Sequence, residues 1–296
     1  MRQAEEYGPT ITENPSYVEL YSSRSLKGFV TSPNKLYMVN ILITNDDGIY
    51  AEGLFALKSA LDSVGTVHVI APDRPRSASG HSITLHKPLR INKVRLPDGT
   101  YGYATNGTPS DCISLGVLDI VGKKVDLVVS GINWGPNLGW DLTYSGTVSA
   151  AMEAAIMDIP AFAISVASYG EGISFDYAAD FAVFLARLLM KHRLPSDTLL
   201  NVNVPNVPAA HIRGIEVTRQ GKRRYSGKIE KRVDPMGRAY YWLGGDTAID
   251  ELEEGTDVKA IADDKVSVTP VHLDLTGYPA LEQLRTWGIE QFEPGG

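Results

Sequence analysis

The stretch ILITNDDGIYAEG, residues 41–53, joins an apolar run to two adjacent carboxylates. The letters ILIT predict a short strand that is covered on both faces. Asp46 and Asp47 follow it, and Gly48 fits a turn at the end of the strand. Ionised Asp side chains that stand together repel each other and are rarely buried without a partner. The stretch therefore predicts either a solvated Asx-type turn or a site for a positive group, and alone it does not decide between them.

The segments that follow alternate between strand and helix. Apolar residues at helical spacing mark 51–65, 146–159 and 176–192, and apolar runs rich in β-branched residues mark 66–72, 125–131 and 161–167. This alternation predicts an α/β fold with a mostly parallel sheet and helices on both faces. Ligands of such sheets bind at the carboxyl ends of the strands. Asp46 and Asp47 lie at such an end.

Other segments depart from this alternation. Residues 82–108 alternate in polarity around Pro-Asp-Gly, which predicts a β-hairpin. The letters NGTPSDC at 106–112 predict a helix start with Pro109 in its first turn, and Cys112 as a core residue rather than a nucleophile. The character changes after Val204, and residues 212–245 are basic, aromatic and turn-rich, which predicts an antiparallel appendage. A strand at 265–273 and a helix at 278–288 close the chain.

Composition narrows the class of protein. The 296 residues carry a net charge of -7, which argues against a nucleic-acid groove and means that bound phosphate needs local donors or a metal. The single cysteine allows no internal disulfide and suits a cytoplasmic location. No apolar run is long enough to span a membrane. Residues 1–37 are polar and lack the apolar core of a signal peptide, so we expect a loose tail or a start codon upstream of the true one.

A loop rich in hydroxyls follows the second strand. The letters APDRPRSASGHS at 71–82 bring Ser77, Ser79, Gly80 and His81 together in one loop. Hydroxyls and backbone amides suit a phosphate group or a hard cation. A segment that mixes Ser, Gly and Arg is more often a solvated loop without a binding function. A position beside the Asp pair, which neighbouring strands would give, favours the functional interpretation.

A longer glycine-rich loop follows the strand at 125–131. It brings Asn133 and Asn137 to the same sheet edge and ends in Ser145-Gly146-Thr147, where a helix begins. A helix start with Ser and Thr offers free amides and hydroxyls to an anion, although simple N-capping explains any single one of them. The letters GxxxxGK[ST] of a P-loop are absent from the sequence, and GxGxxG does not follow the first strand.

Three strand ends thus supply carboxylate, hydroxyl and amide oxygens. These hard ligands suit Mg²⁺ or Mn²⁺ better than Zn²⁺ or Cu²⁺, and no His or Cys spacing resembles a zinc site. A hard metal beside an anion cradle indicates phosphate-ester hydrolysis. Two alternatives use the same residues: a non-catalytic nucleotide- or anion-binding module, and a glycosyl- or acyl-transferring α/β enzyme with a cation bound to Asp.

Six motifs then occur in one order: ILITNDDGI, APDRPRSASGHSIT, GTPSDC, VVSGINWGPNLG, YSGTVSAAMEA and TRQGKRRY. With them the chain resembles the SurE (survival protein E) nucleotidases from Met38 to the last helix. The resemblance implies a Rossmann-like core at 38–205 and a β-rich extension with the last helix at 206–296, together one domain. It also implies that the extension is exchanged between subunits, which gives a homodimer or homotetramer.

The resemblance further implies a metal-dependent 5'-nucleotidase. Its substrates would be nucleoside 5'-monophosphates, with 3'-nucleotides and short polyphosphate as further substrates. One divalent cation per subunit, Mg²⁺ or Mn²⁺, would be held by Asp46, Asp47, Ser77 and Asn133, of which the two Asp are also catalytic. The residues expected to contact phosphate or substrate are Asn45, Ser79, Gly80, His81, Asn137, Ser145, Gly146 and Thr147. Residues 1–37 and Trp134 depart from the family pattern, so no base preference is carried over.

Overall fold

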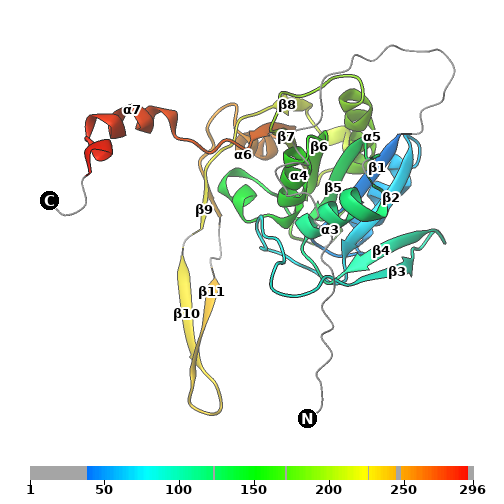
Figure 1. The fold of residues 1–296 in the computed structure, drawn as a ribbon, viewed down its shortest axis with the longest axis horizontal. Coiled ribbons are helices and arrows are strands. Elements are labelled where there is room, and N and C mark those ends of the chain that lie inside the picture. The colour runs from blue at the N-terminus through cyan, green and yellow to red at the C-terminus, as the bar shows by residue number, and fades with distance from the viewer. Residues whose placement is uncertain (1–38, 123, 171, 226, 245–247, 293–296) are drawn as a thin grey trace, which may run out of the picture. The chain divides into compact units, whose positions relative to one another are not determined.

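The computed structural model describes residues 39–122, 124–170, 172–225, 227–244 and 248–292. The predicted tail at 1–37 lies outside the described residues. The chain builds a mixed sheet with nine strands (Figure 1). In spatial order these are β3 (Ile91–Arg95), β4 (Tyr101–Thr105), β2 (Thr66–Pro72), β1 (Asn40–Thr44), β5 (Leu127–Trp134), β6 (Ala161–Ala167), β7 (Thr198–Pro205), β13 (Val266–His272) and β8 (Ile215–Val217).

The centre of the sheet is parallel, as the sequence predicts. Strands β4, β2, β1, β5, β6 and β7 all pair in parallel, while β13 runs antiparallel to β7 and β3 antiparallel to β4. The predicted hairpin within 82–108 is the pair β3–β4. Because β4 also pairs with β2, this hairpin forms the edge of the main sheet and is no separate unit.

Helices cover both faces of the sheet, which confirms the prediction of an α/β fold. On one face α2 (Glu52–Leu61) and α5 (Asp176–Leu189) pack on Ile41 and Ile43. On the other, α3 (Pro109–Leu115) and α4 (Gly146–Ile156) pack on Leu42. The alternation of side chains along β1 therefore feeds two apolar cores. Cys112 lies fully buried in the second core, as predicted.

The chain after β7 does not form one antiparallel appendage. Strands β8 and β13 join the main sheet, whereas β9 (Arg223–Tyr225) pairs with β12 (Ala248–Asp250), and β10 (Lys228–Val233) with β11 (Ala239–Gly244). Helix α6 (Asp257–Ala262) precedes β13, and α7 (Tyr278–Thr286) follows it. Short helical turns are η1 (Gly116–Ile120), η2 (Gly139–Thr143), η3 (Ala209–His211) and η4 (Ile289–Gln291). Within the part of the chain that the structure describes, no helix meets the length and hydropathy of a membrane span.

The register of the central strands brings three loops to one edge of the sheet. Ile43 pairs with Val69 of β2 and with Val129 of β5, so the three strands end close together. The loops that leave these ends carry the Asp pair, the hydroxyl-rich segment and Asn133. The loop after β5 then leads into α4 (Figure 1). The three loops that carry the predicted site residues therefore leave the carboxyl edge of the sheet together, where ligands of parallel sheets bind.

Candidate active site

A tight turn directly follows β1. The buried Asn45 accepts a hydrogen bond from the Gly48 amide at Oδ1 and donates one from Nδ2 to the Gly48 carbonyl, both at 3.1 Å. Gly48 has a φ of 102°, which favours glycine. The Asx-type turn considered as the alternative to a site is thus present. It uses both polar atoms of the Asn45 side chain, and it carries Asp46 and Asp47 out of the strand.

Asp46 is a buried carboxylate that forms no ion pair in the part of the chain that the structure describes. Its side chain is held by the hydroxyl of Thr147, the second residue of α4, which donates to Oδ1. Burial raises the pKa of Asp46 to about 6, the charge of Asp47 adds to the rise, and hydrogen bonds from Thr147 oppose it. No Lys, Arg or His is among the main causes of this shift, and Asp46 forms no ion pair among the described residues. A cation at this position would therefore stabilise the charged form.

Asp47 is half-buried and is attached to β5 rather than to α4. Its Oδ2 accepts the backbone amide of Trp134 at 3.1 Å, and burial raises the pKa of Asp47 as well. The neighbouring carboxylates are thus fixed by different elements. Asp46 keeps Oδ2 and Asp47 keeps Oδ1 for a ligand, because the other oxygen of each has a hydrogen-bond donor.

The loop after β2 contacts the Asp pair directly. The amide of Arg76 donates to the Asp46 carbonyl at 2.7 Å. Ser79 places a buried hydroxyl oxygen here that has no hydrogen-bond partner in the described structure. A Cβ added to Gly146 would lie 2.9 Å from this oxygen and 2.9 Å from Cβ of Asp46, so the three residues meet at one point. Ser77 lies exposed in the same loop.

His81 points to a different partner. Its Nε2 lies 3.0 Å from Oε2 of Glu153, a buried residue of α4, whose Oε1 accepts the hydroxyl of Ser114 at 3.0 Å. The Gly80 amide donates to the Tyr144 carbonyl at 3.0 Å. These contacts tie the loop to α4 and to the segment before it. Sequence reasoning did not identify Glu153, although a single acid in the run AAMEAA was an available signal.

The two asparagines beyond β5 differ in their surroundings. Asn133 is 9% exposed and donates from Nδ2 to the Gly135 carbonyl at 2.8 Å, which leaves its Oδ1 for a ligand. Asn137 is buried against the core: its Nδ2 donates to Ser165 of β6 at 2.8 Å, and its amide donates to Oδ1 of Asn203 on β7, also at 2.8 Å. Asn137 thus fixes the path of the loop.

The start of α4 offers backbone donors beside Asp46. Ser145 caps the helix by accepting the amide of Val148 at 3.1 Å, so its hydroxyl is already in use. The amides of Gly146 and Thr147, in the first turn, have no partner within the helix, and the Thr147 amide also acts on the Asp46 carboxylate. They lie next to Asp46 and Ser79, as the Gly146 contacts show. Such a helix start suits the oxygens of a phosphate group.

These donors fit a hard divalent cation with a phosphate beside it. The unpartnered Ser79 hydroxyl and the buried Asp46 carboxylate both lie against Gly146 at the start of α4. Oxygen donors of this kind match Mg²⁺ or Mn²⁺. In the described residues, no three side chains of His, Cys, Asp or Glu cluster as a metal site.

Gly146→Ala should lower kcat/KM for a phosphomonoester about 10- to 100-fold, because a shift of about 1 Å in catalytic groups has effects of this size. The new methyl group would press on Ser79 and Asp46. Alanine is a good helix residue, so we expect the fold to persist. Steady-state kinetics and thermal unfolding measure both effects. Gly227→Ala is the matched control, because nothing lies within 4 Å of its added Cβ. Equal kinetics in both variants would contradict this geometry.

Comparison with known proteins identifies similar chains. The family described as "Survival protein SurE" matches residues 41–227. "5'-nucleotidase SurE" of Geobacter sulfurreducens is 51% identical over 86% of this chain and 96% of its own length. The same name is carried by a protein of Geotalea daltonii, 52% identical over 85% of this chain and 100% of its own. The SurE crystal structure from Aquifex aeolicus matches with a TM-score of 0.72 and 44% identity, over 84% of this chain and 99% of that one.

Proposed function

This chain belongs to the SurE family, and we propose that it is a metal-dependent 5'-nucleotidase. It hydrolyses nucleoside 5'-monophosphates to a nucleoside and phosphate. The observation that carries the proposal is the buried Asp46 carboxylate, which forms no ion pair among the described residues. It lies with the unpartnered Ser79 hydroxyl against Gly146, the first residue of α4. The names of relatives at about half identity support the substrate class.

We propose Asp46, Asp47, Ser77 and Asn133 as the residues that hold one divalent cation, Mg²⁺ or Mn²⁺. The free oxygens of the two Asp and of Asn133 support this assignment, and Ser79 lies beside them. When bound, the cation supplies positive charge that polarises a phosphoryl oxygen and lowers the pKa of water.

The protein's own groups then bind and orient the substrate. The amides of Gly146 and Thr147 would donate to the phosphoryl oxygens as charge develops on them. The Thr147 hydroxyl keeps Asp46 in one orientation, since it occupies Oδ1. Burial of Asp46 keeps bulk water away from the carboxylate and strengthens its electrostatic interactions. We propose that one of the two Asp also accepts the proton of the attacking water.

Phosphate release from a panel of substrates tests this function. We expect turnover of AMP and GMP in the presence of Mn²⁺ or Mg²⁺, and we propose 3'-AMP and short polyphosphate as slower substrates. The alternative function, a nucleotide- or anion-binding module, predicts binding of AMP without release of phosphate. Absence of turnover on every phosphomonoester, with AMP still bound, would therefore favour that alternative.

We also propose a cytoplasmic homodimer or homotetramer assembled through residues 206–296. The support is a set of large apolar side chains that this region leaves exposed on β10–β11 and near α7. They are Ile229, Tyr241, Trp242, Leu275, Trp287 and Phe292. A second copy of the chain is the occupant that the family resemblance implies for this surface.

A further inference from the structure

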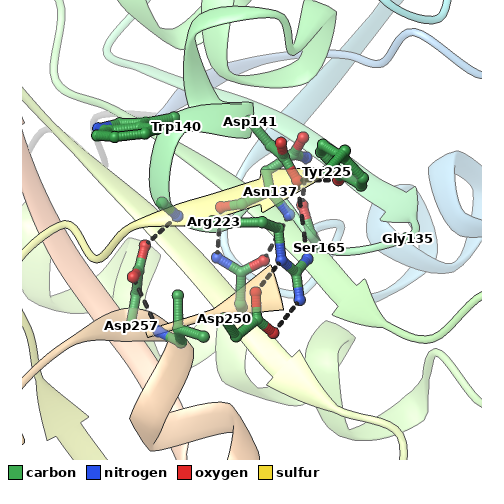
Figure 2. A network of polar contacts seen from close by, with 12 residues as sticks. Gly135, Asn137, Trp140, Asp141, Ser165, Arg223, Tyr225, Asp250 and Asp257 are labelled. Carbon is green, nitrogen blue, oxygen red and sulfur yellow. Dashed lines mark hydrogen bonds and ion pairs between the residues drawn. The ribbon is translucent and has the colours of Figure 1, made fainter. Parts of the chain in front are cut away.

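The loop at 135–145, which joins β5 to α4, is anchored at three residues by hydrogen bonds to other parts of the chain. Figure 2 labels two of them, Asn137 and Asp141. The loop begins beside Asn133 and ends at the phosphate-facing start of α4. The first anchor is Asn137, whose amide and side chain bond to β6 and β7. The other two anchors, Gly139 and Asp141, bond to residues that lie far along the chain, in the region after residue 206.

Both the backbone amide and the backbone carbonyl of Gly139 form hydrogen bonds with the chain after residue 206. Its amide donates to Oδ2 of Asp257 at 2.8 Å, and its carbonyl accepts Nε2 of Gln220 at 2.8 Å. Gly139 has a φ of 54°, and a Cβ added there would lie 2.8 Å from the amide nitrogen of Arg223. The segment around Arg223 therefore packs directly against the loop, and glycine is required for the approach.

Asp257 is the group that joins the two segments. Its carboxylate is fully buried and accepts three amides: Gly139, Gly221 at 2.7 Å and Val258 at 2.8 Å. Burial raises the pKa of Asp257, and these hydrogen bonds oppose the rise. Hydrogen bonds to a charged acceptor are among the stronger ones in proteins. One carboxylate thus connects the loop after β5 with the chain before β9.

The third anchor is Asp141. Tyr225 donates from its hydroxyl to Oδ2 of Asp141 at 2.5 Å, and Arg223 places Nη1 3.7 Å from the same oxygen. Arg223 itself is held by a bidentate pair with Asp250 at 2.7 and 2.8 Å. The short sheet β9–β12 therefore fixes the part of the loop that leads into α4, as the dashed contacts in Figure 2 show.

We propose that Asp257 is a positioning residue for the proposed nucleotidase: through Gly139 it sets the path of the loop that delivers the phosphate-facing start of α4. Asp257 itself touches no substrate. Its effect passes through the loop, with Gln220, Arg223 and Tyr225 as supporting contacts. The kinetic consequence rests on the proposed function, whereas the effect on the loop does not.

Asp257→Asn tests this proposal. The side chain of Asn has nearly the same shape as that of Asp, but an NH2 group replaces one carboxylate oxygen. This NH2 donor would face the amide of Gly139 or of Gly221, so one hydrogen bond is lost. We expect faster amide hydrogen exchange confined to residues 137–147 and 219–223, with exchange in β1, β5 and β6 unchanged. With AMP we expect kcat to fall about 10- to 100-fold. The Kd for Mn²⁺ should change less than kcat, by less than about 3-fold, because Asp46 and Asp47 stand on the turn after β1 and Asn133 on β5, outside the loosened loop. Asp263→Asn, at the partly exposed end of the same helix, is the matched control.

Gln220→Ala is the second variant, since it removes only the bond to the Gly139 carbonyl. It should show the same local exchange with a smaller loss of kcat, and it decides the matter if Asp257→Asn does not fold. Wild-type exchange in the loop of both variants would overturn the proposal. Faster exchange spread over the whole chain would overturn it as well, because that marks a purely structural role. A wild-type protein without phosphatase activity would instead refute the proposed function, and the exchange data would still test Asp257.

Discussion

Asp46→Asn should lower the rate of phosphate release from AMP on the order of 10³-fold, because it removes the buried charge that faces the cation. The same substitution should stabilise the metal-free protein. Burial raises the pKa of Asp46 from 3.8 to about 6, which corresponds to about 3 kcal/mol of lost stability when the group is charged. Asn keeps an oxygen for the Thr147 hydroxyl. Loss of activity with a gain of stability separates a functional residue from a structural one.

The sign of the stability effect follows from linkage. The folded protein binds the Asp46 proton more tightly than the unfolded chain, so its stability falls as the pH rises between about 4 and 6 and stays low above that range. Without metal, the variant should therefore exceed wild type by up to about 3 kcal/mol at pH 7.5 and by less than about 1 kcal/mol near pH 4. Urea unfolding with EDTA measures this difference. Asp119→Asn, an exposed site, is the matched control. Full activity in Asp46→Asn would contradict the metal site.

Removal of divalent cations should abolish phosphate release from AMP, with a loss on the order of 10²-fold or more, and added Mn²⁺ or Mg²⁺ should restore it. Two adjacent carboxylates that form no ion pair among the described residues are the physical reason. The cation should also stabilise the fold, by about 2.7 kcal/mol at a concentration 100 times its Kd. Phosphate release and thermal unfolding with EDTA and with each metal measure both effects. Turnover that survives complete chelation would contradict this prediction.

The sequence alone predicts the centre of the fold well. Apolar runs such as that of β1 and the helical spacing of α2, α4 and α5 are local signals, and the parallel order follows from their alternation. The meeting of Asp46, Ser79 and Gly146 at one sheet edge also follows, because parallel strands end together. β7 is not predicted, since Asn201 and Asn203 interrupt its apolar pattern. Their side chains serve a distant partner, the carbonyl of Asn137.

The remaining contacts of the site could not be predicted, because they join residues far apart in the chain. Asp257 and Gly139 are separated by 118 positions, and His81 and Glu153 by 72. Neither the periodicity of apolar residues nor a helix-capping motif in the sequence indicates such a pair. The same holds for β8 and β13, whose place in the main sheet depends on pairing with each other and with β7. The prediction of a separate appendage was therefore wrong for β8, whereas β13 was predicted as a strand outside the appendage.

The most direct test of whether the Asp pair holds the catalytic cation is a titration of metal-depleted protein with Mn²⁺. Electron paramagnetic resonance measures the concentration of free Mn²⁺ at each step. Wild type should bind one ion per chain, and phosphate release from AMP should rise in step with occupancy. Asp46→Asn should bind Mn²⁺ at least about 10-fold more weakly. Wild-type affinity in this variant, or phosphate release that does not depend on bound Mn²⁺, would show that the Asp pair does not hold the catalytic cation.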